Sequence, residues 1–536
     1  MLFSEIFRLL GRYLLSFALI LCVPLGVSLW YEFSLEPGSY ECTIAFMATL
    51  LITLLLSGLL LRLGRRALGI FYKRESLIVV ILIWVITVVI SAVPFLMTRT
   101  LTNPLDACFE SMSALTTTGG SVIAPKAYDN AGAEIPITIP CTFDPCRSFT
   151  YYGTVTPIRD PVTHEIVREG IEAVSKGILF WRSFLEWLGG MGIVVLFIAV
   201  FPALAIGGRY LFEAEVTGPS KEGVTPRIKE TASLLWKIYV GFTVIELALL
   251  MITNRSLSFF DALNLTFSTI STGGFSIHND SLAAYHNGAT NAIVMIFMIV
   301  GSINFILYYH CLKGKIYRIY EPEFFYFLLS LFLSCLLLSW NLWDTPKEGG
   351  VFSWSEALYY GSFHAISSQT STGLSLANYT LWPASCQSIL LILMFVGGMS
   401  GSTSGGIKII RHCIFFRVLF DKVESLFRPE TVRSLKIGRK EISSKTALTV
   451  LVFVGFLIII TIGATFLFIT CGLDPFTAFS TTACMINNGG MTFGAASSSF
   501  AFLTPLAKGL SIFLMLLGRL ELFAILALFF PAFWRK

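Results

Sequence analysis

Charged residues are scarce in this sequence. Of its 536 residues only 13% are Asp, Glu, Lys or Arg, against about 25% in soluble domains. Hydrophobic residues make up 55% of the chain. A single soluble core could not bury that much apolar surface, so lipid must cover much of it. The composition therefore predicts a membrane protein.

Sequence motifs of common enzymes are also lacking. There is no HExxH zinc motif, no P-loop, and no GxGxxG after a predicted strand. No aspartate pair or Ser/Lys dyad stands out at membrane depth. These absences argue against a membrane protease or transferase, and any control by nucleotides would have to come from a partner.

The eleven cysteines are scattered, and most lie in or beside apolar segments as small core residues. Only Cys141 and Cys146 lie close together in a polar stretch, CTFDPC. With no histidine nearby in sequence, a metal site there is not indicated. If the stretch is extracytoplasmic, a Cys141–Cys146 disulfide is plausible, and two free thiols are an equal alternative.

Apolar residues form ten segments that are long enough to cross a bilayer, which takes about 20 residues in a helix. The first follows Arg8 and Arg12 like a signal peptide, but it is too long for one and no cleavage site follows, so it is predicted to stay as a membrane helix. Glycines and serines interrupt the eighth. The segments are 9–32, 43–63, 76–98, 183–206, 232–253, 289–312, 324–343, 387–417, 446–470 and 505–531.

Every second loop between these segments is basic. The basic loops are 62–74, 209–237, 313–318 and 408–445, and the chain ends in Arg535-Lys536. Because positive charge marks cytoplasmic loops, both termini are predicted to face the cytoplasm. Contact with anionic lipid is a second role for the same charges.

Four of the outside loops repeat one pattern, a short semi-apolar helix and then a turn rich in Ser, Thr and Gly. Each short helix has an acidic residue near its predicted start, which suits a helix N-terminus. The four stretches are 109–121, 263–276, 363–375 and 479–492. We align them on their first glycines, which are Gly119, Gly273, Gly373 and Gly489. The acidic residues are Asp106, Asp261, Glu356 and Asp474.

The predicted fold is an all-α polytopic membrane protein with four pseudo-symmetric helix–pore-loop–helix repeats around one central pore. Two extra membrane helices precede the repeats. The predicted units are 1–72 (the two extra helices), 73–208 (with an extracytoplasmic insertion at 124–178), 209–318, 319–440 (with an intramembrane loop at 397–408) and 441–536.

Turns of this kind can bind ions inside a membrane. Irregular backbone at membrane depth must be buried in protein or line a water-filled path, and a ring of carbonyl oxygens can replace the hydration shell of a monovalent cation. No acid occupies any of the four turns, unlike a divalent-cation path. Close helix packing is the alternative for one such stretch, but four matching ones favour a pore. The candidate filter residues are Thr117, Thr118, Gly119, Ser271, Thr272, Gly273, Ser371, Thr372, Gly373, Asn487, Asn488 and Gly489.

Three long motifs carry a family resemblance that covers nearly the whole chain. They are FWRSFLEWLGGMGIVVL at 180–196, GGMSGSTSGGIK at 397–408 and GRLELFAILALFFPAFWR at 518–535. With these motifs the sequence resembles the Trk/Ktr/HKT superfamily of potassium transporters, and within it the bacterial TrkH-type pore subunit. The resemblance implies K⁺ selectivity from four filter glycines and K⁺ uptake across a bacterial inner membrane. The insertion 124–178 and the Asn-Asn-Gly of the fourth turn depart from the family pattern.

The interrupted eighth span predicts a gate. The segment 397–406 holds five glycines in ten residues, which cannot form a stable helix. It must therefore line a cavity as a flexible plug; a packing kink is the alternative. The resemblance implies an intramembrane loop that blocks the path. The candidate gate residues are Gly397, Gly398, Ser400, Gly401, Ser402, Gly405, Gly406 and Arg519.

Arg519 lies inside the tenth span, where a charge faces a cavity or a partner. Either it pairs with Glu521 or with backbone carbonyls as an anchor, or it projects into the pore below the filter, which the resemblance favours. Glu246, His310 and His364 are predicted to be structural groups, and a proton relay through the histidines is a weaker alternative.

The resemblance also implies partners: a homodimer with one pore in each protomer, and a cytoplasmic nucleotide-binding regulatory subunit of the TrkA kind. No organic cofactor and no nucleic acid is expected, and K⁺ is the transported ion. Membrane potential alone could drive uptake, at about 2.3 kcal/mol per charge and 100 mV. Symport with H⁺ or Na⁺ is the alternative, ranked lower because intramembrane carboxylates are few.

Overall fold

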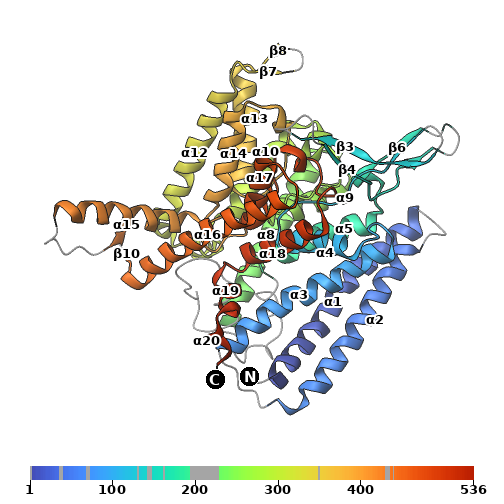
Figure 1. The fold of residues 1–536 in the computed structure, drawn as a ribbon, viewed down its shortest axis with the longest axis horizontal. Helices are drawn as coiled ribbons and strands as arrows, with labels where there is room; N and C mark the ends of the chain where they lie inside the picture. The colour runs from blue at the N-terminus through green and yellow to red at the C-terminus, as the bar shows by residue number, and fades with distance from the viewer. Residues whose placement is uncertain are drawn as a thin grey trace.

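The computed structural model describes residues 3–35, 40–67, 73–129, 132–141, 148–160, 163, 165–192, 228–347, 350–428, 435–438 and 440–535. Helices dominate this part of the chain, and its strands form only two-stranded antiparallel pairs (Figure 1). The predicted all-α membrane fold is therefore confirmed.

Six helices are long and apolar enough to span a membrane, counting only the part of the chain that the structure describes. They match six predicted spans: α1 (Phe3–Leu35), α2 (Glu41–Leu63), α3 (Lys73–Met97), α8 (Ile228–Thr253), α12 (Pro322–Leu342) and α16 (Ser444–Thr470). The fourth predicted span begins with α5 (Lys176–Gly190). Its continuation, 193–206, lies outside the described residues.

The four predicted short helices are present as α4 (Pro104–Leu115), α9 (Phe259–Ile270), α13 (Trp354–Gln369) and α17 (Pro475–Asn487). Each begins at a side-chain cap, which satisfies a backbone N–H that has no partner within the helix. The caps are Asn103, Ser258, Ser353 and Asp474. Local sequence thus explains where each short helix starts.

Two further predicted spans are each present as a bent pair of helices, a break that was not predicted from the sequence. The span 289–312 consists of α10 (Gly288–Ser302) and α11 (Phe305–Leu312), which meet at 95°. Asn304 caps α11 by accepting from the N–H of Ile306 at 2.9 Å, and Phe305 donates its N–H to Gly401 at 3.3 Å. These contacts replace helical hydrogen bonds.

The span 505–531 is broken in the same way. It consists of α18 (Pro505–Arg519) and α19 (Phe523–Phe529), bent by 118°, and the short α20 (Pro531–Trp534) follows. At the bend, Glu521 and Leu522 have φ of 55° and 49°, which a right-handed helix cannot contain.

The eighth span is interrupted as predicted. Helix α14 (Ala384–Val396) ends before the glycine-rich segment, and α15 (Ile409–Phe427) begins after it. Figure 1 shows α15 at the left of the view, reaching outward from the repeats. The predicted interruption of the eighth span is confirmed, whereas its position inside the membrane and its gating role stay predictions.

The described part of the insertion 124–178 contains three antiparallel strand pairs on one side of the molecule (Figure 1). They are β1 (Ala127–Tyr128) with β2 (Glu134–Ile135), β3 (Ile137–Pro140) with β4 (Ser148–Tyr151), and β5 (Ile158–Arg159) with β6 (Ile166–Arg168). Two more pairs lie elsewhere: β7 (Pro346–Lys347) with β8 (Gly350–Val351), and β9 (Lys436–Ile437) with β10 (Lys440–Glu441). Cys141 is buried in the insertion, and Cys146 lies outside the described residues, so their disulfide stays a prediction.

Candidate functional site

The four turns after the short helices share one backbone conformation. In each, a residue other than glycine has a positive φ, and a glycine two positions later has one too. The pairs are Thr117 (56°) and Gly119 (77°), Thr272 (54°) and Gly274 (90°), Ser371 (57°) and Gly373 (84°), and Asn488 (51°) and Gly490 (67°). Because positive φ is uncommon outside glycine, its fourfold recurrence identifies equivalent positions.

Hydrogen bonds give the same register. The residue between each pair donates its N–H to a carbonyl in the last turn of the preceding short helix. These bonds are Thr118 to Ser113 (2.8 Å), Gly273 to Ser268 (2.9 Å), Thr372 to Ser367 (2.9 Å) and Gly489 to Cys484 (3.0 Å). Gly273 and Gly489 are therefore equivalent to Thr118 and Thr372.

The alignment on the first glycine of each turn was thus wrong by one residue in the second and fourth repeats. The equivalents of Gly119 are Gly274 and Gly490, because these have the positive φ. Both turns hold a double glycine, and composition alone does not say which one needs this conformation. The equal spacing from Asp106 to Gly119 and from Asp261 to Gly274 was the available clue.

The four turns close into a ring. A Cβ added to each of these glycines would stand 1.9–3.4 Å from a carbonyl oxygen of the next turn. Gly119 faces the oxygen of Gly273, Gly274 that of Thr372, Gly373 that of Gly489, and Gly490 that of Thr118. The order runs once through the chain and returns to the first turn. A side chain at these positions would push neighbouring turns apart.

The ring is lined by neutral groups. All Ser, Thr and Asn side chains named as filter candidates are buried. Among the described residues no group of three or more His, Cys, Asp or Glu could hold a metal ion. The oxygens available for a cation here are therefore those of backbone carbonyls, hydroxyls and side-chain amides.

The glycine-rich segment 397–408 packs directly against the ends of three short helices. Gly405 donates its N–H to Ser371 Oγ at 2.5 Å, and Gly406 donates to the Asn487 carbonyl at 3.0 Å. Thr403 Oγ1 donates to the Ile270 carbonyl at 3.2 Å. The segment therefore contacts the second, third and fourth repeats where their turns begin.

The same segment is held from its other side. Ser400 donates its N–H to Glu323 Oε1 of α12 at 2.7 Å, and Met399 donates to the Ser302 carbonyl at 2.9 Å. The Lys408 ammonium donates to the Ser404 carbonyl. The segment is thus a loop with a defined set of hydrogen bonds, not a kink between two turns of helix.

Arg519 connects the remaining turn to this segment. Its guanidinium donates to Thr117 Oγ1 at 3.2 Å and to the Thr403 carbonyl at 3.1 Å. It also donates to the Gly190 carbonyl at 2.7 Å and to that of Gly189, at the negative end of the α5 dipole. Arg519 thus binds backbone carbonyls, as the anchor alternative predicts, and it also contacts the first turn, whereas its projection into a pore stays a prediction.

The three other residues predicted to be structural groups contact residues near them in the fold. His364 is fully buried, with Nδ1 2.8 Å from the Tyr360 carbonyl, and Nε2 accepts from the N–H of Leu376 at 3.4 Å. His310 contacts Arg318 at 2.9 Å. Glu246 is fully buried in α8 beside Thr269 of α9.

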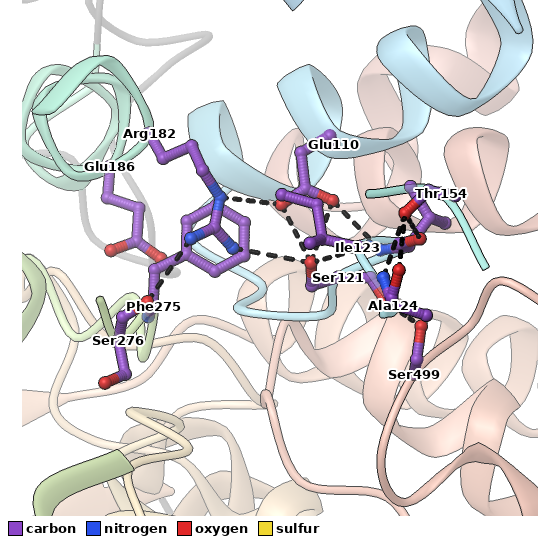
Figure 2. Close-up of polar contacts among 11 residues, drawn as sticks. Glu110, Ser121, Ile123, Ala124, Thr154, Arg182, Glu186, Phe275, Ser276 and Ser499 are labelled. Carbon is purple, nitrogen blue, oxygen red and sulfur yellow. Dashed lines mark hydrogen bonds and ion pairs between the residues drawn. The ribbon is translucent and has the colours of Figure 1, made fainter. Parts of the chain in front are cut away.

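Sequence reasoning missed a buried ionic cluster behind the first and second turns (Figure 2). Arg182 of α5 pairs with Glu110 of α4 at 2.8 Å, and both side chains are at most 1% exposed. Glu186 accepts from the N–H of Phe275 at 3.0 Å. Charges inside the otherwise uncharged stretches FESMS and FWRSFLEW were the clue.

Comparisons with known proteins agree with this architecture. The family model described as TrkH, cation transport protein, matches residues 162–343 and 350–536. The chain is 32% identical to the Trk system potassium uptake protein TrkH of Halomonas elongata, over 99% of both chains. It is 31% identical to the Salmonella typhimurium protein of the same name, over 100% of both.

A solved structure is similar over its full length. The crystal structure of the potassium transporter TrkH from Vibrio parahaemolyticus aligns with a TM-score of 0.80 and 29% identity, covering 100% of each chain. These relatives are transport proteins by name, not enzymes. The chain therefore belongs to the TrkH family of cation transport proteins.

Proposed function

We propose that this protein takes up K⁺ across a bacterial inner membrane through the ring of four turns. The observation that carries the proposal is the closed cycle of glycines and carbonyl oxygens, Gly119 to Gly273 onward. Such carbonyls can replace the hydration shell of K⁺, and an uncharged ring suits a monovalent ion. Relatives named as potassium uptake proteins support the choice of ion.

In this proposal each repeat, 73–208, 209–318, 319–440 and 441–536, supplies one turn. The selectivity filter consists of residues 117–119, 272–274, 371–373 and 488–490, and Ser271 and Asn487 precede two of them. Relative to the sequence-based set, Gly274 and Gly490 join the filter because of their conformation.

The gate in this proposal is the glycine-rich segment together with Arg519. Contacts with all four repeats favour a closed path, since the segment reaches three turns directly and the first through Arg519. The guanidinium adds a positive charge that repels cations. Opening then requires the segment to leave Ser371 and Asn487.

The basic loops face the cytoplasm in this proposal, as do both termini, so a negative interior draws K⁺ inward. In Figure 1 both termini lie at the lower edge, and Arg74 at the start of α3 donates to the Arg535 carbonyl at 2.9 Å. A TrkA-type regulatory subunit binds these loops, and two protomers assemble as a dimer. Each protomer keeps its own pore because four turns already close one ring.

Symport is the second candidate. It is favoured by Glu246, a fully buried carboxyl group next to the second short helix, because proton- or Na⁺-coupled carriers use intramembrane carboxylates. Channel-like uptake needs no such group.

K⁺ flux in proteoliposomes at a fixed voltage, without a Na⁺ or H⁺ gradient, separates the two candidates. Persistent K⁺ flux is expected for uptake driven by voltage, whereas strict dependence on a second gradient would establish symport. Glu246→Gln should leave the voltage-driven flux unchanged.

The filter assignment has its own test. Gly119→Ser should lower the K⁺/Na⁺ flux ratio, because the new Cβ would meet the Gly273 carbonyl. Gly241→Ala is the matched control, since no atom lies within 4 Å of the added carbon. An unchanged ratio in folded Gly119→Ser protein would exclude the first turn from the filter.

A further inference from the structure

A buried ionic cluster, made of Glu110, Arg182 and Glu186, lies behind the first two turns (Figure 2). A buried ion pair is costly to desolvate, and apolar residues of similar size often replace one without loss of stability. Stability of the fold therefore gives no sufficient reason for this cluster. Its further contacts point to another role.

Glu110 and Arg182 bind the chain where it leaves the turns. Glu110 accepts from Ser121 Oγ at 2.9 Å and from the N–H of Val122 at 2.9 Å, just after the first turn. Arg182 donates to Ser121 Oγ at 3.4 Å and to the Ser276 carbonyl at 3.3 Å, just after the second turn. One guanidinium thus joins two repeats (Figure 2).

Glu186 supports the second turn directly. It lies one helical turn after Arg182 on α5, and its carboxylate accepts from the N–H of Phe275 at 3.0 Å. A Cβ on Gly273 would stand 2.5 Å from Glu186 Cδ, so the carboxylate lies against this backbone. The carbonyl of Gly273 faces Gly119, so displacement of Glu186 would change the distance between the two turns.

A comparison of the four repeats shows how the support of the second turn differs from that of the others. In three repeats, the residue five positions after the turn's first positive-φ residue donates its N–H to a side chain of the short helix. The pairs are Val122 with Glu110 (2.9 Å), Leu376 with His364 (3.4 Å) and Phe493 with Ser480 (2.7 Å). The second repeat has Leu265 at the position of Glu110 and His364, and Leu265 cannot accept. Glu186 of α5 supports this turn at another point, because it accepts from the N–H of Phe275, three positions after Thr272 and not five.

We propose that Glu110, Arg182 and Glu186 are positioning residues that fix the spacing between the first and second turns, and thereby the discrimination of K⁺ from Na⁺. The inference rests on the proposed filter. When the cluster is intact, the ring cannot contract around the smaller ion. When it is removed, the first two turns can approach or separate, and Na⁺ passes more readily.

Three variants test this inference in the full-length protein in proteoliposomes. Glu186→Ala removes the support of the second turn, Arg182→Met with Glu110→Met replaces the pair by apolar groups, and Arg182→Lys keeps the charge but loses the forked geometry. We expect the K⁺/Na⁺ flux ratio to fall about tenfold in the first two, equal to about 1.4 kcal/mol. It should fall less in Arg182→Lys.

The control is Lys508→Gln, which breaks another buried ion pair of α4, Lys508 with Asp106 at 2.6 Å. It should lower thermal stability but leave the flux ratio unchanged, so a general loss of stability is distinguished from lost positioning. A higher K⁺/Na⁺ flux ratio in Arg182→Lys than in Arg182→Gln is a second readout, because a merely structural role would not change this ratio.

The inference is overturned if Glu186→Ala, correctly folded, keeps the wild-type flux ratio while Gly119→Ser lowers it. Glu186→Ala decides the question even where the double methionine variant does not accumulate. If Gly119→Ser also leaves the ratio unchanged, the filter assignment itself is wrong, which is a different result.

Discussion

Gly405→Ala tests most directly whether the glycine-rich segment closes the path. The Gly405 N–H donates to Ser371 Oγ at 2.5 Å, and the next N–H, of Gly406, donates to the Asn487 carbonyl at 3.0 Å. A Cβ at Gly405 would stand 2.0 Å from that carbonyl oxygen. Carbon atoms do not approach oxygen so closely, so the methyl group fits only if the segment moves away from the turns.

The size of the effect follows from the two hydrogen bonds. Each contributes about 1 kcal/mol, and the displacement breaks both of them in the closed arrangement alone. The closed state then loses about 2 kcal/mol, which shifts the ratio of open to closed protein roughly 30-fold. Basal K⁺ flux should rise by the same factor while few molecules are open.

The assay is K⁺ flux into proteoliposomes at a fixed voltage, without a regulatory subunit. Gly455→Ala in α16 is the matched control, because nothing lies within 4 Å of its added carbon and its flux should equal that of the wild type. Thermal unfolding verifies that both variants fold. Wild-type basal flux in folded Gly405→Ala protein would refute the idea that this segment occludes the path.

Three further predictions concern the contacts around the segment. Arg519→Gln should raise basal K⁺ flux about tenfold or more, because charged hydrogen bonds of about 1.5–3 kcal/mol each to Thr117 and Thr403 are lost; Arg519→Lys should raise it less, and equal flux in both would contradict a role for the fork. Glu323→Ala should raise basal K⁺ flux several-fold, because the N–H of Ser400 loses its acceptor at 2.7 Å and the closed state is destabilised by about 1 kcal/mol. Glu323→Gln, which keeps an acceptor oxygen, is the control. Asn304→Ala should destabilise the protein by about 1 kcal/mol through its lost α11 cap, measured as a lower unfolding temperature in detergent, and an unchanged temperature would mean that the bend does not depend on the cap.

Much of the fold could be predicted from local sequence. The short helices begin at capping side chains such as Asn103 and Asp474, which can be identified from a few neighbouring residues in the sequence. The break in the eighth span follows from its glycines. Features that depend on neighbouring residues in the chain were therefore predictable.

Features that depend on distant contacts were not. The bend before Phe305 has a local cap in Asn304, but it forms where Phe305 donates to Gly401, far along the chain. Both glycines of the second turn lie against distant groups, Gly273 against Glu186 and Gly274 against the Thr372 carbonyl. Arg182 and Glu110 are 72 positions apart, and no local pattern pairs them.

Hydrogen bonds join the ring of turns to the ionic cluster and to the glycine-rich segment. The first turn is held from behind by Glu110 and from below by Arg519, which also holds Thr403 of the segment. Movement of the segment therefore removes a contact of Arg519 and changes the environment of Thr117 at the same time. A ring built from four different turns allows this, since one turn can respond while the others keep their own hydrogen bonds. In the proposed mechanism, gating and selectivity would thus be coupled through the first repeat, where Arg519 donates to Thr117.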